Sequence, residues 1–213
     1  MYRPGFYDCQ DLNVVRQIME HNPFATLVSN GESLLATHLP LLAVKNDDAD
    51  LTLVGHLARQ NPQAQTLQGD SEVLCIFSGA DAYISPRWYK DEEDVPTWNY
   101  SAVHAYGRPS ILESHSATRG VLSSTVDHFE SDFDHAWSLD ALHEGFLDQL
   151  QSDVIAFTIS ISRLECATKL GQDKSTDDRR RVSEGLTAQP SSKANEVAAD
   201  MLDLLGETPN PRR

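Results

Sequence analysis

The sequence predicts an α+β protein built around an antiparallel β-barrel with peripheral helices. After one helical segment, strand-like runs follow in quick succession and are separated by turns. The dipeptide Asn30-Gly31 joins two of these runs and is typical of a tight hairpin turn. Because helical spacing returns only in the second half of the chain, the order differs from the strand–helix alternation that builds parallel sheets.

The first predicted helix spans residues 11–21. Apolar residues recur there on one face, Asp11 can cap the start, and Asn22-Pro23 ends the helix. Residues 46–50 are rich in Asn and Asp and predict a turn. Hydrophobic runs bounded by such turns predict strands at residues 24–29, 33–44, 51–55, 72–78, 82–85 and 100–112.

The second half of the chain begins with helical patterns. Apolar residues at spacings of three and four predict helices at residues 117–129 and 139–150, and alternation predicts a closing strand at residues 154–164. We expect residues 1–186 to form one domain with these peripheral helices. The stretch 187–213 differs in composition and predicts a linker and tail.

A short amphipathic helix is predicted within that tail, at residues 195–205, after a linker-like stretch at 188–192. Residues 208–213 are expected to be a loose end, and the tail as a whole to be dispensable. Alternatively, the apolar side chains of the helix dock on a second subunit. These side chains are Val197, Met201, Leu204 and Leu205.

The charge of the chain argues against direct DNA binding. Seventeen Lys and Arg residues against thirty-two Asp and Glu residues give a net charge of −15, which repels a phosphate backbone. The basic run 179–181 is preceded by two aspartates, and no DNA-binding motif stands out. The chain has no long apolar run and no signal-peptide pattern, so we expect a cytoplasmic protein that does not enter a membrane.

The three cysteines predict buried thiols. Cys9, Cys75 and Cys166 are widely spaced, odd in number and without a CxxC pair. This pattern argues against a disulfide framework and against a thiolate metal site. The eight histidines are also scattered without a metal-binding motif, so we expect no metal.

The segment from Tyr83 to Arg108 predicts a binding surface. Seven of the sixteen aromatic residues lie between Phe77 and Tyr106, together with prolines and hydroxyl groups around an acidic loop. Large flat side chains stack well on a planar ligand or a partner surface. The alternative is that these rings form barrel core, although plain core strands avoid proline.

Several ordered motifs carry a family resemblance. They are Asn22-Pro23-Phe24, the run 36–42 (ATHLPLL), the run 55–62 (GHLARQNP), Ile84-Ser85-Pro86 with Trp88-Tyr89, and the run 96–100 (PTWNY) followed by Val103-His104 and Gly107-Arg108. The chain resembles the PaiB-like family of FMN-binding split-barrel proteins, often described as negative transcriptional regulators of protease synthesis and sporulation. The resemblance covers residues 1–186. It implies a split barrel resembling pyridoxamine-phosphate oxidase, a homodimer and FMN held at the subunit interface.

FMN has an anionic phosphate, a polar ribityl chain and a flat ring, so its site needs cations at one end and stacking groups at the other. We expect the segment from Gly55 to Pro62 to leave a strand and enter a short helix, with His56 and Arg59 near a phosphate. Alternatively, Arg59 is a solvated surface charge and His56 bonds to backbone. The candidate cofactor-binding residues are Thr37, His38, His56, Arg59, Asn61, Ser85, Trp88, Thr97, Trp98, Asn99, Lys169 and Gln172.

The chain departs from its relatives around Gln172. The family pattern has serine and asparagine beside this glutamine, where this sequence has Gly171 and Asp173. The change removes a hydroxyl donor and adds a negative charge near a predicted phosphate site. Weak or absent FMN binding is therefore an open alternative.

Three functions remain open from the sequence. The first is a homodimeric FMN-binding protein that acts as a redox protein, a sensor or an FMN-dependent oxidoreductase. The second is a flavin-independent regulatory module that binds other proteins, and the third is a haem-handling split barrel. No nucleophile or other catalytic residue stands out.

Overall fold

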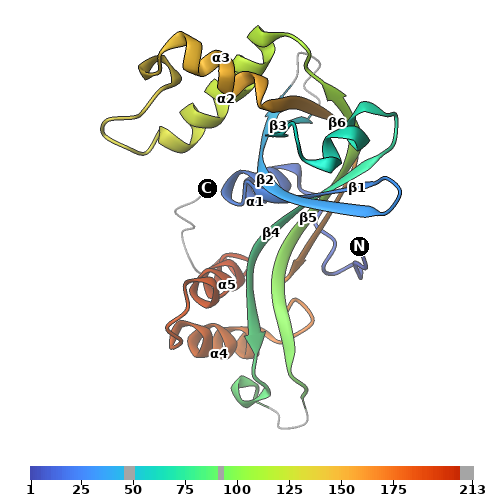
Figure 1. Cartoon of the computed structure of the whole chain (residues 1–213). Helices are drawn as coiled ribbons and strands as arrows, with labels where there is room; N and C mark the ends of the chain where they lie inside the picture. The colour runs from blue at the N-terminus through green and yellow to red at the C-terminus, as the bar shows by residue number, and fades with distance from the viewer. Residues whose placement is uncertain (46–50, 91–93, 207–213) are drawn as a thin grey trace. The chain divides into compact units, whose positions relative to one another are not determined.

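The computed structural model describes residues 1–45, 51–90 and 94–206, and Figure 1 shows the arrangement of its helices and strands. The predicted turn at 46–50 and the predicted loose end at 208–213 lie outside the described residues. The strands are β1 (Phe24–Asn30), β2 (Leu34–Lys45), β3 (Leu51–Ala58), β4 (Val73–Ile84), β5 (Thr97–Ile111) and β6 (Val154–Lys169). The α-helices are α1 (Leu12–His21), α2 (His115–Glu130), α3 (Glu144–Ser152), α4 (Thr176–Thr187) and α5 (Ser192–Asp203), and the 3₁₀ turns are η1 (Pro62–Gln68), η2 (Pro86–Trp88) and η3 (Leu139–Ala141).

The chain forms two compact units. The first, which we call the terminal unit, contains residues 1–18, 78–103 and everything described from Glu165 onward. The second, the barrel unit, contains Met19–Phe77 and His104–Leu164. Strands β4, β5 and β6 contribute residues to both units. The predicted boundary after residue 186 falls near the end of α4, inside the terminal unit.

The strands form a closed antiparallel barrel in the order β1-β2-β3-β6-β5-β4, which confirms the predicted α+β barrel. Strands β1 and β2 form the predicted hairpin, with Phe24 opposite Pro40 and Asn30 opposite Leu34. Strand β3 pairs with β6 from Thr52–Ser160 to Ala58–Val154, and β1 closes onto β4. Alternate side chains therefore point inward, as the burial of β1 shows.

The barrel core consists of large apolar side chains with one buried amide at its edge. Fully buried members include Leu27, Leu41, Leu53, Phe77, Phe157 and Ile159. The side-chain amide of Gln63, in η1, donates to the carbonyl of Leu27 at 3.0 Å and to Ser29 Oγ at 2.9 Å. Because this buried donor is satisfied by β1, it holds η1 against the barrel without an unpaired N–H.

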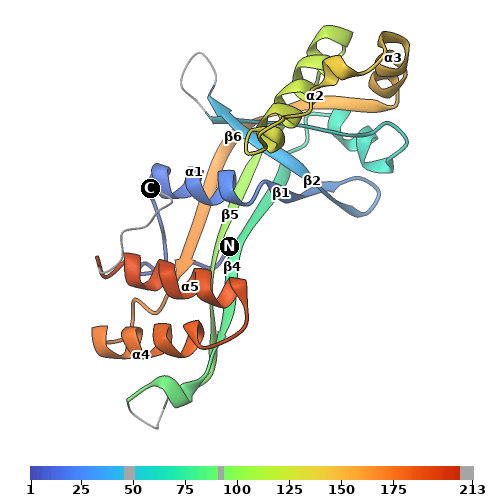
Figure 2. The same ribbon diagram turned by 90° about the vertical axis from the view of Figure 1, so that its left-hand side faces the viewer.

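Helices α4 and α5 pack side by side in the terminal unit, as Figures 1 and 2 both show. Their buried face joins β4 in a second core made of Ala80, Ala82, Ile84, Leu170, Val182, Leu186, Ala194, Val197, Ala198 and Met201. The rings of Trp88 and Tyr89 pack against this core. Val197 and Met201 are buried within this chain, so the alternative that these two side chains dock on a second subunit is wrong.

Several predicted boundaries differ from the structure. The predicted strands 72–78 and 82–85 are one strand, β4, because Gly79 lets the backbone pass close to Ser101. The predicted helix 139–150 is divided into η3 and α3, since Leu142 is extended and α3 begins only after His143. Strand β3 continues past residue 55 to Ala58, where its ladder with β6 ends.

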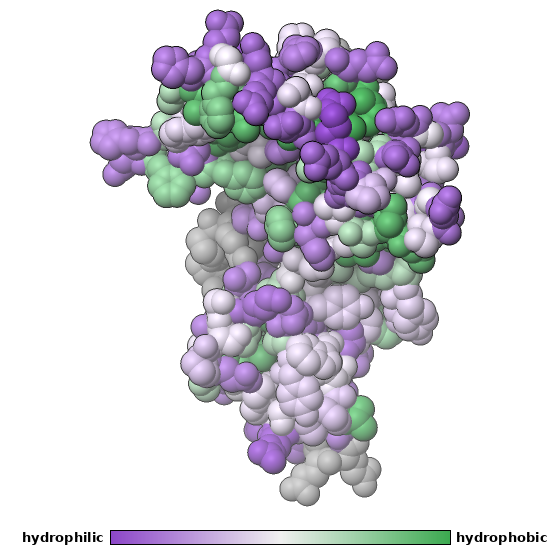
Figure 3. Space-filling view, viewed as in Figure 1, coloured by the Kyte–Doolittle hydropathy of each residue, from purple (hydrophilic) through white to green (hydrophobic). Residues whose placement is uncertain are grey.

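The region of α2 and α3 keeps large apolar side chains exposed. In Figure 3 green side chains lie among purple ones over these helices. The exposed members are Phe129, Phe133, Trp137, Phe146 and Leu150. Among the described residues, no helix is long and apolar enough to cross a membrane.

The contact between α4 and η2 generates a stability prediction. A Cβ atom on Gly185 would lie 2.4 Å from Trp88 Cε2, so Gly185→Ala forces the indole or α4 to move. We expect the free energy of unfolding to fall by about 1–3 kcal/mol. Urea denaturation followed by tryptophan fluorescence measures the change.

The matched control is Gly120→Ala, in α2, where an added Cβ meets nothing within 4 Å. Alanine is the better helix former, so this substitution should raise the free energy of unfolding by about 0.5–1 kcal/mol. If the two substitutions change the free energy of unfolding equally, the contact with Trp88 does not restrict the side chain at position 185.

Candidate functional site

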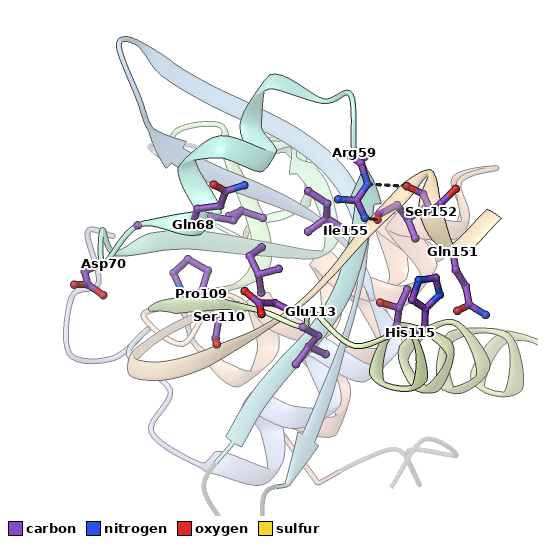
Figure 4. Close-up of a pocket in the computed structure, with 16 residues that line it drawn as sticks. Arg59, Gln68, Asp70, Pro109, Ser110, Glu113, His115, Gln151, Ser152 and Ile155 are labelled. Carbon is purple, nitrogen blue, oxygen red and sulfur yellow. Dashed lines mark hydrogen bonds between the residues drawn. The ribbon is translucent and has the colours of Figure 1, made fainter. Parts of the chain in front are cut away.

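The barrel unit contains a cavity of about 910 Å³. This volume lies in the range of roughly 300–1,000 Å³ that is usual for small-molecule sites. The cavity is bounded by the ends of β3, η1 and β5 and by α2 and the start of β6 (Figure 4). Its lining residues are Arg59, Leu67, Gln68, Gly69, Asp70, Pro109, Ser110, Ile111, Leu112, Glu113, His115, Thr118, Gln151, Ser152, Val154 and Ile155.

Arg59 is fixed at the edge of this cavity by backbone carbonyls. It is the first residue after β3, and its own N–H donates to the carbonyl of Asp153 at 2.8 Å. Its Nε donates to the carbonyl of Ser152 at 2.6 Å, and its Nη2 to that of Val154 at 2.8 Å. Within the described part of the chain, Nη1 has no hydrogen-bond partner. The guanidinium is therefore held in place and retains a donor group for a ligand.

The charges around the cavity are separated. Figure 4 shows Arg59, Ser152 and His115 on one side and Asp70 with Gln68 on the other. Asp70 is held there because its carbonyl accepts a hydrogen bond from Arg108 at 2.8 Å. A bound anion is therefore attracted to the Arg59 side and repelled from the carboxylate side.

Sequence reasoning identified Arg59 in this cavity and missed its other polar lining groups. Those groups include Gln68, Ser110, Glu113, His115 and Gln151. They lie at element ends that are distant in sequence, such as the start of α2 and the last turn of α3. No local sequence motif predicts these residues, because only closure of the barrel brings the ends of these helices and strands to one cavity.

His56 lies inside β3, opposite Ala156 of β6, and not in a turn after the strand. Its Nδ1 is buried and has no hydrogen-bond partner among the described residues. The alternative that His56 bonds to the backbone therefore does not hold for Nδ1. Burial lowers the pKa of His56 below its usual 6.5, so the ring is neutral near pH 7. His56 is not among the residues that line the cavity.

Thr37 and Asn61 are brought together in the barrel unit, whereas His38 faces elsewhere. Asn61 Nδ2 donates to Thr37 Oγ1 at 3.0 Å, and Asn61 Oδ1 accepts the N–H of Gln63 at 2.9 Å and caps η1. His38 is exposed, hydrogen-bonds Thr26 Oγ1 at 3.0 Å, and stacks on Phe24. His38 therefore lies on the surface of β2.

The terminal unit brings a second set of predicted residues together. Lys169, at the end of β6, donates to Thr97 Oγ1 and, at 2.7 Å, to the carbonyl of Trp98. Gln172 closes the following loop on itself, because its Oε1 accepts the N–H of Leu170 at 2.8 Å and its Nε2 donates to Thr168 O. Burial lowers the pKa of Lys169. The ammonium is thus placed by β5 and partly desolvated.

Asn99 and the predicted rings differ in how accessible they are. Asn99 is buried, and its Nδ2 lies 3.4 Å from Met201 Sδ. Trp98 is 54% exposed and meets Tyr83 edge to face at 6.1 Å between ring centroids. Trp88 packs against Gly185, while Ser85 accepts the N–H of Arg87 at 3.4 Å and caps η2. Of the two predicted tryptophans, Trp98 therefore presents the larger surface to a ligand or partner.

Asp173, the acidic departure from the family pattern, has partners within the terminal unit. The hydroxyl of Tyr7 donates to Asp173 Oδ1 at 2.8 Å, and Lys174 Nζ lies 4.0 Å from its carboxylate. Burial and this carboxylate raise the pKa of Tyr7, so the phenol remains the donor. These contacts partly offset the added negative charge near Lys169 and Gln172.

A family model and a similar protein sequence both indicate the same family for this chain. A model described as "Putative FMN-binding domain" matches residues 1–163. The chain is 34% identical over 206 residues to "Protease synthase and sporulation protein PAI 2" of Bacillus subtilis (strain 168), covering 96% of this chain and 98% of that protein.

Solved structures resemble the chain at low identity. The flavocytochrome Anf3 from Azotobacter vinelandii has a TM-score of 0.63 at 14% identity and covers 90% of this chain and 79% of its own. The FAD and heme binding protein from Mycobacterium smegmatis has a TM-score of 0.59 at 14% identity, covering 81% and 78%. At this identity the likeness shows the fold alone, and it agrees with the split barrel that the motifs imply.

The partly buried imidazole of His56 generates a prediction about pH. Its pKa is lower in the folded chain than in the unfolded one, so the unfolded state binds an extra proton below about pH 6.5. We expect the free energy of unfolding to fall as pH drops from 7 toward the folded pKa, and to fall less in His56→Leu. Urea denaturation at pH 7.5, 6.5 and 5.5 tests this expectation.

The control is His135→Gln, which removes an exposed imidazole. This variant should retain the pH dependence of the original chain. If His56→Leu shows an unaltered pH dependence, burial of His56 does not affect its protonation in the folded state.

Proposed function

Because this chain belongs to the PaiB-like FMN-binding domain family, we propose that it binds FMN in the barrel cavity and acts as a flavin-dependent redox protein or sensor. The observation that carries the proposal is the fixed guanidinium of Arg59. It lies at the edge of a cavity large enough for a cofactor, and Nη1 is left for an anionic group.

The chemistry of the cavity fits the polar part of the cofactor. A phosphate placed beside Arg59 also has the imidazole of His115 on its side of the cavity (Figure 4). The amide and hydroxyl groups of Gln151 and Ser110 suit a ribityl chain. The carboxylates of Asp70 and Glu113 disfavour the reverse orientation.

The remaining predicted contacts are proposed on the basis of their chemistry. In the barrel unit the candidate contacts are Thr37, His38, His56, Arg59 and Asn61. Taken by itself, the terminal unit carries the candidates Ser85, Trp88, Thr97, Trp98, Asn99, Lys169 and Gln172. Lys169 supplies a partly desolvated cation, and Trp98 supplies an exposed ring for stacking. When bound, FMN supplies the electron-transfer chemistry, and the side chains that line the barrel cavity bind and orient it.

FMN titration of the purified chain tests the proposal. We expect saturable binding with quenching of flavin fluorescence, and dissociation constants about 10- to 100-fold higher for Arg59→Ala, because a charge-assisted hydrogen bond to phosphate is lost. Riboflavin, which lacks the phosphate, should bind the original chain and Arg59→Ala alike.

The matched control is Arg119→Ala, which removes an exposed cation paired with Asp140 at 2.9 Å. This variant should bind FMN as the original chain does. Thermal denaturation of each variant separates lost binding from lost folding, because Arg59 also bonds to backbone. Unchanged FMN affinity in a folded Arg59→Ala variant would contradict the proposed phosphate site.

A homodimer is the second part of the proposal, with the flavin at the subunit interface. Its support is the exposed apolar surface of the hairpin, where Phe24 is 70% exposed although it lies in a strand. We expect light scattering to give the mass of two chains, and Phe24→Asp to weaken self-association at least about tenfold. Phe146→Asp, at a 52% exposed site on α3, is the control. A single-chain mass at micromolar concentration would contradict the dimer.

A further inference from the structure

The residues before α1 pair with the end of β6 in the terminal unit. Asp8 and Ala167 form an antiparallel bridge, flanked by hydrogen bonds from Cys9 N to Cys166 O at 3.1 Å and from Thr168 N to Tyr7 O at 3.0 Å. In this register Cys9 lies directly opposite Cys166. Opposite residues in antiparallel pairs have Cα atoms about 4.5–5.5 Å apart, within the range of roughly 4.4–6.8 Å that a disulfide needs.

The two thiols lie opposite each other but differ in exposure. Neither sulfur is in a disulfide. Cys166 is buried, whereas Cys9 is only half-buried. The sequence spacing predicted separate buried thiols, and the structure corrects this expectation for Cys9. A reagent from solvent therefore reaches Cys9 first, and Cys166 is positioned to react with Cys9.

The surroundings make Cys9 the more nucleophilic partner. The neighbouring Cys166 thiol lowers the pKa of Cys9 to about 7, with help from the backbone at Asp11 and against burial. The same contact and burial raise the pKa of Cys166. Asp8 and Asp11 oppose the thiolate at Cys9, and Arg3 favours ionisation of Cys166. A substantial thiolate fraction at neutral pH is what thiol–disulfide exchange requires.

We propose that Cys9 and Cys166 are a reversible redox site that closes to an intrachain disulfide in exchange with a small-molecule disulfide. The Cys9 thiolate attacks one sulfur of oxidised glutathione, a mixed disulfide forms and one glutathione thiolate leaves. Cys166 then gives up its proton and attacks Cys9 Sγ, and the second glutathione leaves as a thiolate. Two protein thiols are oxidised, and one glutathione disulfide is reduced to two thiols.

The disulfide ties the amino-terminal segment to the loop after β6. Two residues before Cys9, Tyr7 donates to Asp173 at 2.8 Å, and its ring centroid lies 5.8 Å from Lys169 Nζ. Closing the bond at Cys9 limits movement of Tyr7 away from this loop. The redox site itself does not depend on FMN, so it stands apart from the proposed flavin function.

Thiol counting on the purified full chain tests the proposal. The protein is equilibrated in glutathione buffers of increasing oxidised fraction, quenched with acid, unfolded and labelled with polyethylene-glycol maleimide. We expect three labels per chain under reducing conditions and one, on Cys75, under oxidising conditions. Mass spectrometry should show the loss of two hydrogen atoms and a linked peptide pair containing Cys9 and Cys166. Thermal denaturation should give a Tm roughly 5–10 °C higher for the oxidised form.

Variants separate this bond from other oxidation products. Cys9→Ser should abolish both the one-label form and the Tm shift, and Cys166→Ser should leave a glutathione adduct on Cys9. Cys75→Ala, at a buried thiol in the barrel unit, should still close the bond. Because Cys9 is half-buried, Cys9→Ser tests the proposal even if Cys166→Ser fails to fold. Oxidised protein that keeps three labels, carries only glutathione adducts or cross-links only between chains would overturn the proposal.

Discussion

The antiparallel pairing of β3 with β6 is the constraint on which the candidate site depends. The last pair of this ladder is Ala58 with Val154, so Arg59 leaves the strand opposite Asp153. Its backbone and guanidinium then bond to three consecutive carbonyls of the β6 entry. A shift of this register by one residue would turn every side chain of β3 to the other face and move the guanidinium from the cavity edge.

Barrel closure around this ladder requires close approach of the strands. A Cβ on Gly107 would lie 2.4 Å from the carbonyl oxygen of Ser160, and one on Gly55 would lie 2.6 Å from Leu41 Cδ2. Glycine at these two positions lets neighbouring strands and side chains pack where a larger residue would separate them. These close contacts hold together strands β3, β5 and β6, whose residues also border the cavity.

The end of β6 combines two chemistries within the terminal unit. Cys166 faces the amino-terminal segment, and three residues later Lys169 bonds to Thr97 and to the backbone of Trp98. Tyr7, in the amino-terminal segment, donates from its hydroxyl to Asp173 in the loop after β6. One strand end thus positions both the proposed dithiol and the cation predicted to contact a flavin.

Much of the fold could be predicted from local patterns. The helix at 11–21, the hairpin at Asn30-Gly31 and the closing strand after Val154 follow from spacing and turn chemistry, and the structure has all three. Strand β4 was predicted as two strands because a glycine within a strand pattern locally indicates an interruption. In the structure the strand continues through Gly79, which permits a close contact with Ser101. Local patterns also could not show how far β3 extends, since its end is set by its partner β6.

By itself the sequence determined the strand-rich barrel class, the family motifs and the choice of Arg59 as a candidate cation, because hydrophobic period and short motifs are local properties. Only the tertiary structure decided that His56 keeps a buried nitrogen without a partner in the described chain, and that Gln151 and His115 line the cavity with Arg59. It also decided that Cys9 meets Cys166. These contacts join residues far apart in the chain, and backbone pairing between distant strands brings them together.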